Sequence, residues 1–147
     1  MKETDCLLYK CCGRYAHWLL RLSLASVFLY HGLPKFQDLA GFAGMIDIPV
    51  WAAALVALAE VGGSLALLVG GFWNGILTKI GGSVLVPVLI GAIWMVHWGQ
   101  WGFMATESHP LGGMEFQVVL LALALFFVIM GNQAGGGCCC GDYSKKK

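Results

Sequence analysis

Charged residues are scarce in this chain: only 12% of its 147 residues are charged, whereas 59% are hydrophobic. A soluble domain averages about 25% charged and about 45–50% apolar residues. The low charge and the high apolar content therefore exclude both a water-soluble domain and a disordered chain. The net charge is only +1, so the chain also lacks the basic excess that nucleic-acid binding requires.

Motifs that hold common electron carriers are also missing. The sequence contains no glycine-rich dinucleotide fingerprint and no C-x-x-C pair, so it cannot hold a dinucleotide or an iron–sulfur cluster alone. His31 and His97 are far apart and have no third ligand at helical spacing, which argues against metal or haem binding. We therefore expect no metal and no intrinsic cofactor, and a partner protein must supply the electrons if the chain takes part in redox chemistry.

Six cysteines fall near the two ends of the chain. They are Cys6, Cys11, Cys12, Cys138, Cys139 and Cys140. We expect reduced thiols on the cytoplasmic side of a membrane. Cysteines beside a membrane can also be acylated or contact a partner, and the sequence leaves these alternatives open.

Four apolar segments are long enough to cross a bilayer, which takes about 20 residues. They cover residues 15–34, 50–70, 80–98 and 113–131. Because backbone groups in lipid must be satisfied within the chain, runs of this length predict helices rather than barrel strands. We expect an all-α transmembrane bundle of four helices with up-down-up-down topology. Residues 35–49 carry apolar positions at helical spacing and predict a short interfacial helix.

Basic residues gather on one side of this predicted bundle. They are Lys2, Lys10, Arg14, Lys79, Lys145, Lys146 and Lys147. Lys35 alone lies in a loop on the other side, so the positive-inside rule places both termini in the cytoplasm. We expect a multi-pass protein of the plasma (inner) membrane. It divides into an N-terminal tail (1–14), a membrane domain (15–133) and a Gly/Cys/Lys-rich C-terminal tail (134–147).

Arg21 and Glu60 are the ionisable residues placed deepest in the predicted spans. Each costs about 2.5–3.5 kcal/mol at a helix centre unless it finds a partner. Arg21, Phe28 and Lys35 recur every seven residues, so one face of the first helix is basic and should point into the bundle. We expect a buried Arg21–Glu60 ion pair, which either fixes the helix register or serves the function.

A second polar group is expected toward the outer ends of the helices. His31, Lys35, His97 and Glu115 come from three helices and are placed at similar depth. We expect them to line one polar chamber, because such a group of side chains suits a quinone head group or a proton relay. The alternative is that each is hydrated separately at the interface.

Three stretches, taken in order, resemble the DoxX family of small four-helix membrane proteins. They are RLSLASVFLYHGLPKF at 21–36, ALAEVGGSLALLVG at 57–70, and the region from WMVH at 94–97 to GGMEF at 112–116. The similarity covers residues 15–133. The positions that match the family are Arg21, His31, Gly32, Lys35, Glu60, Gly62, Gly63, His97 and Glu115. We expect the three glycines among them to serve close helix packing.

The resemblance implies a role in membrane redox chemistry, although the family is functionally mixed. Relatives include the DoxD-type membrane subunit of a thiosulfate:quinone oxidoreductase, and others look like partners of redox or oxidative-stress proteins. By this resemblance the chain is the membrane subunit of a redox complex linked to the quinone pool. The alternative is a non-catalytic scaffold that docks an oxidoreductase or an assembly factor. The substrate, the catalytic residues, the partner and a homo- or hetero-oligomeric state stay open.

Overall fold

The computed structural model describes residues 3–135, and it describes the side chains of residues 15–133. All regular elements in this part of the chain are helices, and it contains no strand. Its elements in chain order are α1 (Glu3–Lys35), α2 (Leu39–Met45), α3 (Val50–Phe72), α4 (Gly75–Ala92), the π-helix η1 (Ile93–His97), α5 (Glu115–Met130) and the 3₁₀ helix η2 (Gly131–Gly135). The predicted all-α class is confirmed.

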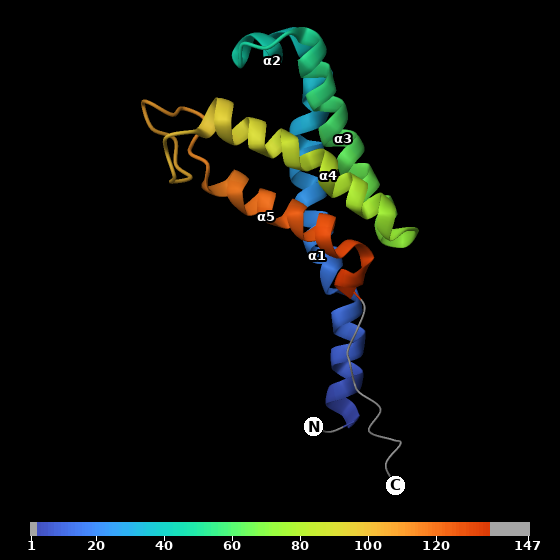
Figure 1. Cartoon of the computed structure of the whole chain (residues 1–147). Helices are drawn as coiled ribbons and strands as arrows, with labels where there is room; N and C mark the ends of the chain where they lie inside the picture. Colours follow the sequence, from blue (N-terminus) through green and yellow to red (C-terminus); the bar gives the residue numbers. More distant parts are fainter. Residues whose placement is uncertain (1–2, 136–147) are drawn as a thin grey trace.

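The long helices form two pairs that cross each other. Helices α1 and α3 lie side by side, and α2 packs against α3 at one end of that pair (Figure 1). Helix α4 packs against both α3 and α5, and the α4–α5 pair runs obliquely across α1 and α3 instead of along them. The predicted up-down-up-down bundle is therefore not confirmed in that form.

Three segments in the described part of the chain are long and apolar enough to span a membrane. They are Val50–Phe72, Gly75–His97 and Glu115–Gln133, and they correspond to the second, third and fourth predicted spans. Helix α1 contains the first predicted span but is not among the three. Within that span it carries Arg21 and His31, which lower its hydropathy.

The predicted tails are only partly described. Residues 1–14 were expected as a tail, but from Glu3 onward their backbone belongs to α1. The side chains of the first three cysteines lie outside the described residues, and so do residues 136–147 with the second cysteine group and the terminal lysines. The short helix expected within residues 35–49 is present as α2, and the Asp38 side chain caps it by accepting a hydrogen bond of 2.7 Å from the backbone N–H of Gly41.

Glycines allow the helices to approach closely at two places. A Cβ on Gly81 of α4 would lie 2.7 Å from the Gly63 carbonyl oxygen of α3, and a Cβ on Gly32 of α1 would lie 2.9 Å from Cβ of Glu60. Neither position has room for a side chain unless the helices separate. The expectation for Gly62 is wrong, because this residue is exposed and an added Cβ would meet nothing within 4 Å.

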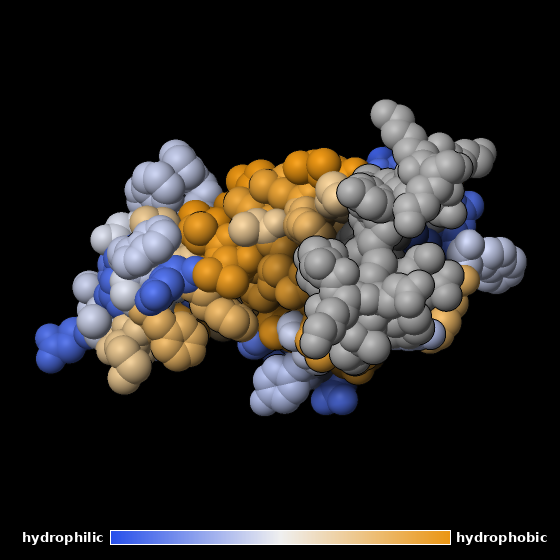
Figure 2. Space-filling view, turned by 90° about the horizontal axis from the view of Figure 1, so that it is seen from below, coloured by the Kyte–Doolittle hydropathy of each residue, from blue (hydrophilic) through white to orange (hydrophobic). Residues whose placement is uncertain are grey.

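Much of the surface is hydrophobic. Figure 2 shows hydrophobic residues gathered in a band across the middle of one face, with hydrophilic residues toward the left end. Large exposed apolar side chains on the three candidate spans include Leu55, Leu58, Val69, Ile80, Ile90, Val119, Leu125 and Ile129. Soluble proteins rarely expose apolar patches of this extent. The surface is that of an integral membrane protein.

Candidate functional site

Arg21 is the centre of a buried polar cluster that joins α1 to α3, α4 and η2. Its guanidinium is 0% exposed and donates hydrogen bonds to the Leu67 carbonyl oxygen at 2.6 Å, to Thr78 Oγ1 at 2.9 Å and to Asn132 Oδ1 at 2.8 Å. A longer bond of 3.5 Å reaches the Gly131 carbonyl oxygen. We call these five residues the arginine cluster. Every acceptor is neutral, so dipoles rather than a carboxylate stabilise the buried charge.

Asn132, which lies in η2 directly after α5, completes this cluster. Its Oδ1 accepts a second hydrogen bond, of 2.7 Å, from Thr78 Oγ1, and its Nδ2 donates to the Gly70 carbonyl oxygen at 2.8 Å. The Phe127 ring of α5 lies 4.8 Å from the guanidinium carbon of Arg21, which is within the range of a cation–π contact. One arginine and one asparagine thus fix the positions of all four long helices relative to one another.

The expected Arg21–Glu60 ion pair is not formed. Helices α1 and α3 pack so that Gly32 lies against Glu60, whereas Arg21 lies beside Leu67. Arg21 precedes Gly32 by eleven residues in the sequence, which at about 1.5 Å per residue puts it about 16 Å from the level of Glu60. That distance exceeds the reach of an arginine. The prediction takes the depth of Arg21 from a span that starts at Tyr15. The register of α1 on α3 is set instead by how the two helices pack, which that count of residues does not contain.

Glu60 pairs with Lys35 instead. Lys35 Nζ lies 2.5 Å from Oε1 and 2.6 Å from Oε2, and the Lys35 and Glu60 side chains are only 16% and 6% exposed. The Phe42 ring of α2 lies 4.5 Å from Nζ. Gly32 leaves space for the carboxylate, since a Cβ there would lie 3.1 Å from Oε2. His31 is exposed on α1 and directly precedes Gly32, the residue that lies against Glu60. We call His31, Lys35 and Glu60 the lysine–glutamate site.

A separate polar site surrounds His97, the last residue of η1. Its Nδ1 lies 2.9 Å from the Gly112 carbonyl oxygen and its Nε2 lies 2.9 Å from Gln117 Nε2. These contacts fit a neutral imidazole that donates from Nδ1 and accepts at Nε2. Gln117 Oε1 is buried and has no hydrogen-bond partner among the described residues. Single π-turns occur often at functional sites.

The four residues expected in one polar chamber are divided between these places. His31 and Lys35 lie on α1 beside α3, and His97 lies at the end of η1 against Gln117 of α5. Glu115 is exposed, and its Oε2 accepts a hydrogen bond of 3.1 Å from the backbone N–H of Phe103. The expectation of one shared chamber is wrong because α4 crosses the α1–α3 pair and its C-terminal end leads away from that pair (Figure 1).

Three polar residues of these sites are absent from the sequence prediction. Thr78 and Asn132 fall just outside the predicted spans 80–98 and 113–131, where a polar residue is ordinary. Gln117 falls inside a predicted span. Each is an uncharged polar residue beside or within an apolar run, and a buried group of this kind must find a hydrogen-bond partner. This requirement is the signal in the sequence that could have pointed to these three residues, although it does not say which group each of them bonds.

Comparison with known proteins now identifies the family. Residues 16–98 match the DoxX family model. The chain belongs to the DoxX family. This DoxX chain is also 31% identical, over 119 residues, to the protein named "Putative oxidoreductase CatD" from Bacillus subtilis (strain 168), and the match covers 78% of each chain. No solved structure matches it. The DoxX match includes Arg21, the lysine–glutamate site and His97, but it ends before α5 and Asn132.

Proposed function

We propose that this DoxX chain is the membrane subunit of a redox complex that reduces quinone, similar to a thiosulfate:quinone oxidoreductase. In this proposal α1, α3, α5 and the segment Gly75–His97 all cross the plasma membrane, and both termini are cytoplasmic. The family match and the name of the CatD relative support a redox role. The observation that carries the proposal is the lysine–glutamate site, where a largely buried carboxylate pairs with Lys35 and packs against Gly32, the residue next to the exposed His31.

The residues of this site fit a quinone head group. Reduction of a quinone to a quinol consumes two electrons, which a partner redox protein supplies, and two protons. His31 and Glu60 are titratable groups that can deliver protons to the two quinone oxygens, and Lys35 provides N–H donors beside them. Quinone is a lipid-soluble substrate, and His31 is exposed, so in this proposal the substrate reaches the site from the bilayer.

The test compares two carboxylates in membrane vesicles that contain the complete complex. Glu60→Gln should lower the rate of quinone reduction by about a hundredfold, which is the lower end of the range typical for the loss of a proton-transfer group. Glu115→Gln is the control, because Glu115 is an exposed carboxylate bound only to a loop N–H, and it should leave the rate unchanged. An unchanged rate in a Glu60→Gln protein that inserts normally would contradict the proposal.

The arginine cluster favours a second candidate, a non-catalytic scaffold that docks an oxidoreductase or an assembly factor. All the hydrogen-bond acceptors of Arg21 belong to other helices of the chain, so the cluster is an element that makes the membrane domain rigid. Under this function, deletion of residues 135–147 should release the partner and leave the thermal unfolding of the remaining chain unchanged. Glu60→Gln should then have no effect on turnover by the docked enzyme.

A further inference from the structure

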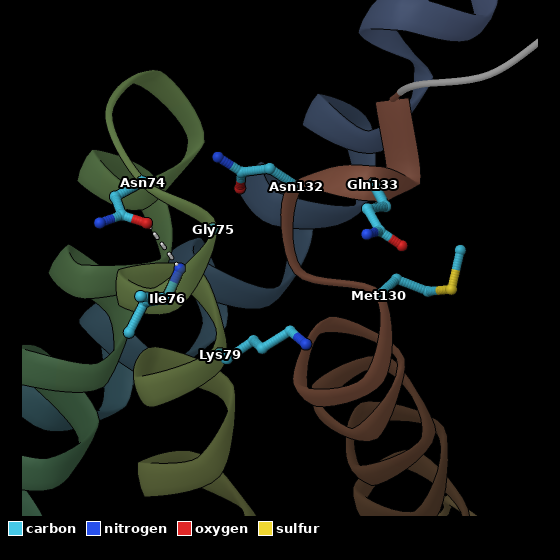
Figure 3. Close-up of a pocket in the computed structure, with 7 residues that line it drawn as sticks. All are labelled: Asn74, Gly75, Ile76, Lys79, Met130, Asn132 and Gln133. Atoms are coloured by element: carbon cyan, nitrogen blue, oxygen red, sulfur yellow. Dashed lines mark hydrogen bonds between the residues drawn. The ribbon is translucent and has the colours of Figure 1, made fainter.

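An open pocket of about 530 Å³ lies between the start of α4 and the end of α5. It is lined by Asn74, Gly75, Ile76, Lys79, Met130, Asn132 and Gln133 (Figure 3). Four of these side chains are polar and one of the four is a cation, whereas none is a carboxylate. The pocket therefore has a positive character that neither the lysine–glutamate site nor the His97 site shares.

Lys79 supplies the charge of the pocket. Figure 3 shows its side chain extending from α4 toward the C-terminal end of α5, and its Cε lies 3.0 Å from the position that a Cβ on Gly131 would take. Within the described part of the chain the one ion pair joins Lys35 to Glu60, and Lys79 has no hydrogen-bond partner there. Its ammonium group, with three N–H donors, is free to bind a ligand.

A second positive charge lies behind the wall of the pocket. Asn132 lines the pocket, and its Oδ1 accepts a hydrogen bond of 2.8 Å from Arg21. Arg21 is fully buried, bonds only neutral acceptors, and its Nε has no hydrogen-bond partner among the described residues. Two neighbouring cations that have no anionic partner attract an anion strongly where the dielectric constant is low. The partial positive charge at the N-terminal end of α4 is opposed by the partial negative charge at the C-terminal end of α5, so the positive character of the pocket comes from the two side chains.

The position of the pocket and its apolar side chains indicate which kind of anion it binds. The pocket joins the first residues of the span Gly75–His97 to the last residues of the span Glu115–Gln133, which is the depth at which lipid headgroups lie. Ile76 and Met130, which are 65% and 36% exposed, line the same pocket. A ligand that joins a phosphate to acyl chains matches both parts of this lining, and basic pockets between membrane helices are known sites for lipid headgroups.

We infer that this pocket binds the phosphate group of an acidic phospholipid, with Lys79 as its charge partner. The polar side chains of Asn74, Asn132 and Gln133 line the space around the headgroup. A bound phosphate also neutralises the positive field of Arg21. The lipid thereby stabilises the junction between the end of α5 and the start of α4.

Native mass spectrometry of the full chain tests this inference, with the protein taken from nanodiscs that mix phosphatidylcholine and phosphatidylglycerol. The unaltered chain should retain phosphatidylglycerol in preference to phosphatidylcholine. Lys79→Gln should reduce that preference about fivefold, as expected for the loss of one lysine at a membrane surface. Lys79→Arg should keep it. Lys147→Gln, which removes the same charge at the end of the chain, should also keep it.

Several results would overturn the inference. One is equal retention of both lipids by the unaltered chain, and another is an undiminished preference in Lys79→Gln. Inorganic phosphate added to nanodiscs of phosphatidylcholine alone separates a free anion from a headgroup: heat stabilisation by phosphate without any preference for phosphatidylglycerol would overturn the lipid assignment. If Lys79→Gln lowers the midpoint of thermal unfolding equally with and without phosphatidylglycerol, Lys79 merely complements the C-terminal end of α5, and the inference fails.

Discussion

Replacing Asn132 with alanine removes the side chain that completes the arginine cluster. The change breaks the hydrogen bonds from Arg21 (2.8 Å) and from Thr78 (2.7 Å), and the bond to the Gly70 carbonyl oxygen (2.8 Å). A hydrogen bond to a charged group contributes about 1.5–3 kcal/mol, and a neutral one between membrane helices about 0.6 kcal/mol. The expected loss in the free energy of unfolding is about 3–4 kcal/mol. Arg21 keeps Leu67 and Thr78, so the chain should still fold.

Steric trapping in bicelles, followed by tryptophan fluorescence, measures this loss. Trp18 is a suitable reporter because its ring lies 5.8 Å from the guanidinium carbon of Arg21. Gln133→Ala is the matched control: Gln133 is the exposed neighbour of Asn132, and its loss should change the free energy of unfolding by less than about 0.5 kcal/mol. If Asn132→Ala costs no more than Gln133→Ala, the claim that this cluster fixes the helices is refuted.

Three further predictions concern single positions, and thermal unfolding in detergent checks each. Gly32→Ala should lower the free energy of unfolding by about 1–3 kcal/mol, because the new Cβ would lie 2.9 Å from Cβ of Glu60. Gly62→Ala should leave it unchanged, because nothing lies within 4 Å of the new Cβ. Equal effects of the two substitutions would contradict this prediction. Glu60→Gln leaves the largely buried Lys35 without a carboxylate and should lower the free energy of unfolding by about 3 kcal/mol. Adding Lys35→Met should recover part of this loss. A further loss of stability in the double variant would argue against the ion pair. Gly131 has a φ of 56°, so Gly131→Ala should cost about 1–3 kcal/mol; an unchanged midpoint would show that the turn tolerates a side chain.

The helices could be predicted from the sequence because a bilayer dictates their length and composition. The second predicted span, 50–70, differs from α3 (Val50–Phe72) by only two residues at its end. The crossing of α4 over the α1–α3 pair could not be predicted in this way. It depends on which small residues meet, such as Gly63 and Gly81, and hydropathy contains no information about such pairings.

The burial of Arg21 and Glu60 was predictable, because exposure of either charge to hydrocarbon is costly. Their partners were not. A search for opposite charges leads from Arg21 to a carboxylate, but carbonyl oxygens and an asparagine side chain also satisfy a guanidinium, and these leave little trace in a sequence. Lys35 was expected in a shared chamber, and its true partner depends on the register that Gly32 sets between α1 and α3.

The arginine cluster joins residues that are far apart in the sequence, and this has a consequence for biosynthesis. Arg21 belongs to α1, whereas Asn132 follows α5. During translation the guanidinium of Arg21 is therefore made before some of its acceptors. The buried charge of Arg21 gains its full set of hydrogen-bond acceptors only after α5 and η2 have been synthesised. A copy that ends before α5 would lack Asn132 and Gly131, two of the residues that accept hydrogen bonds from Arg21.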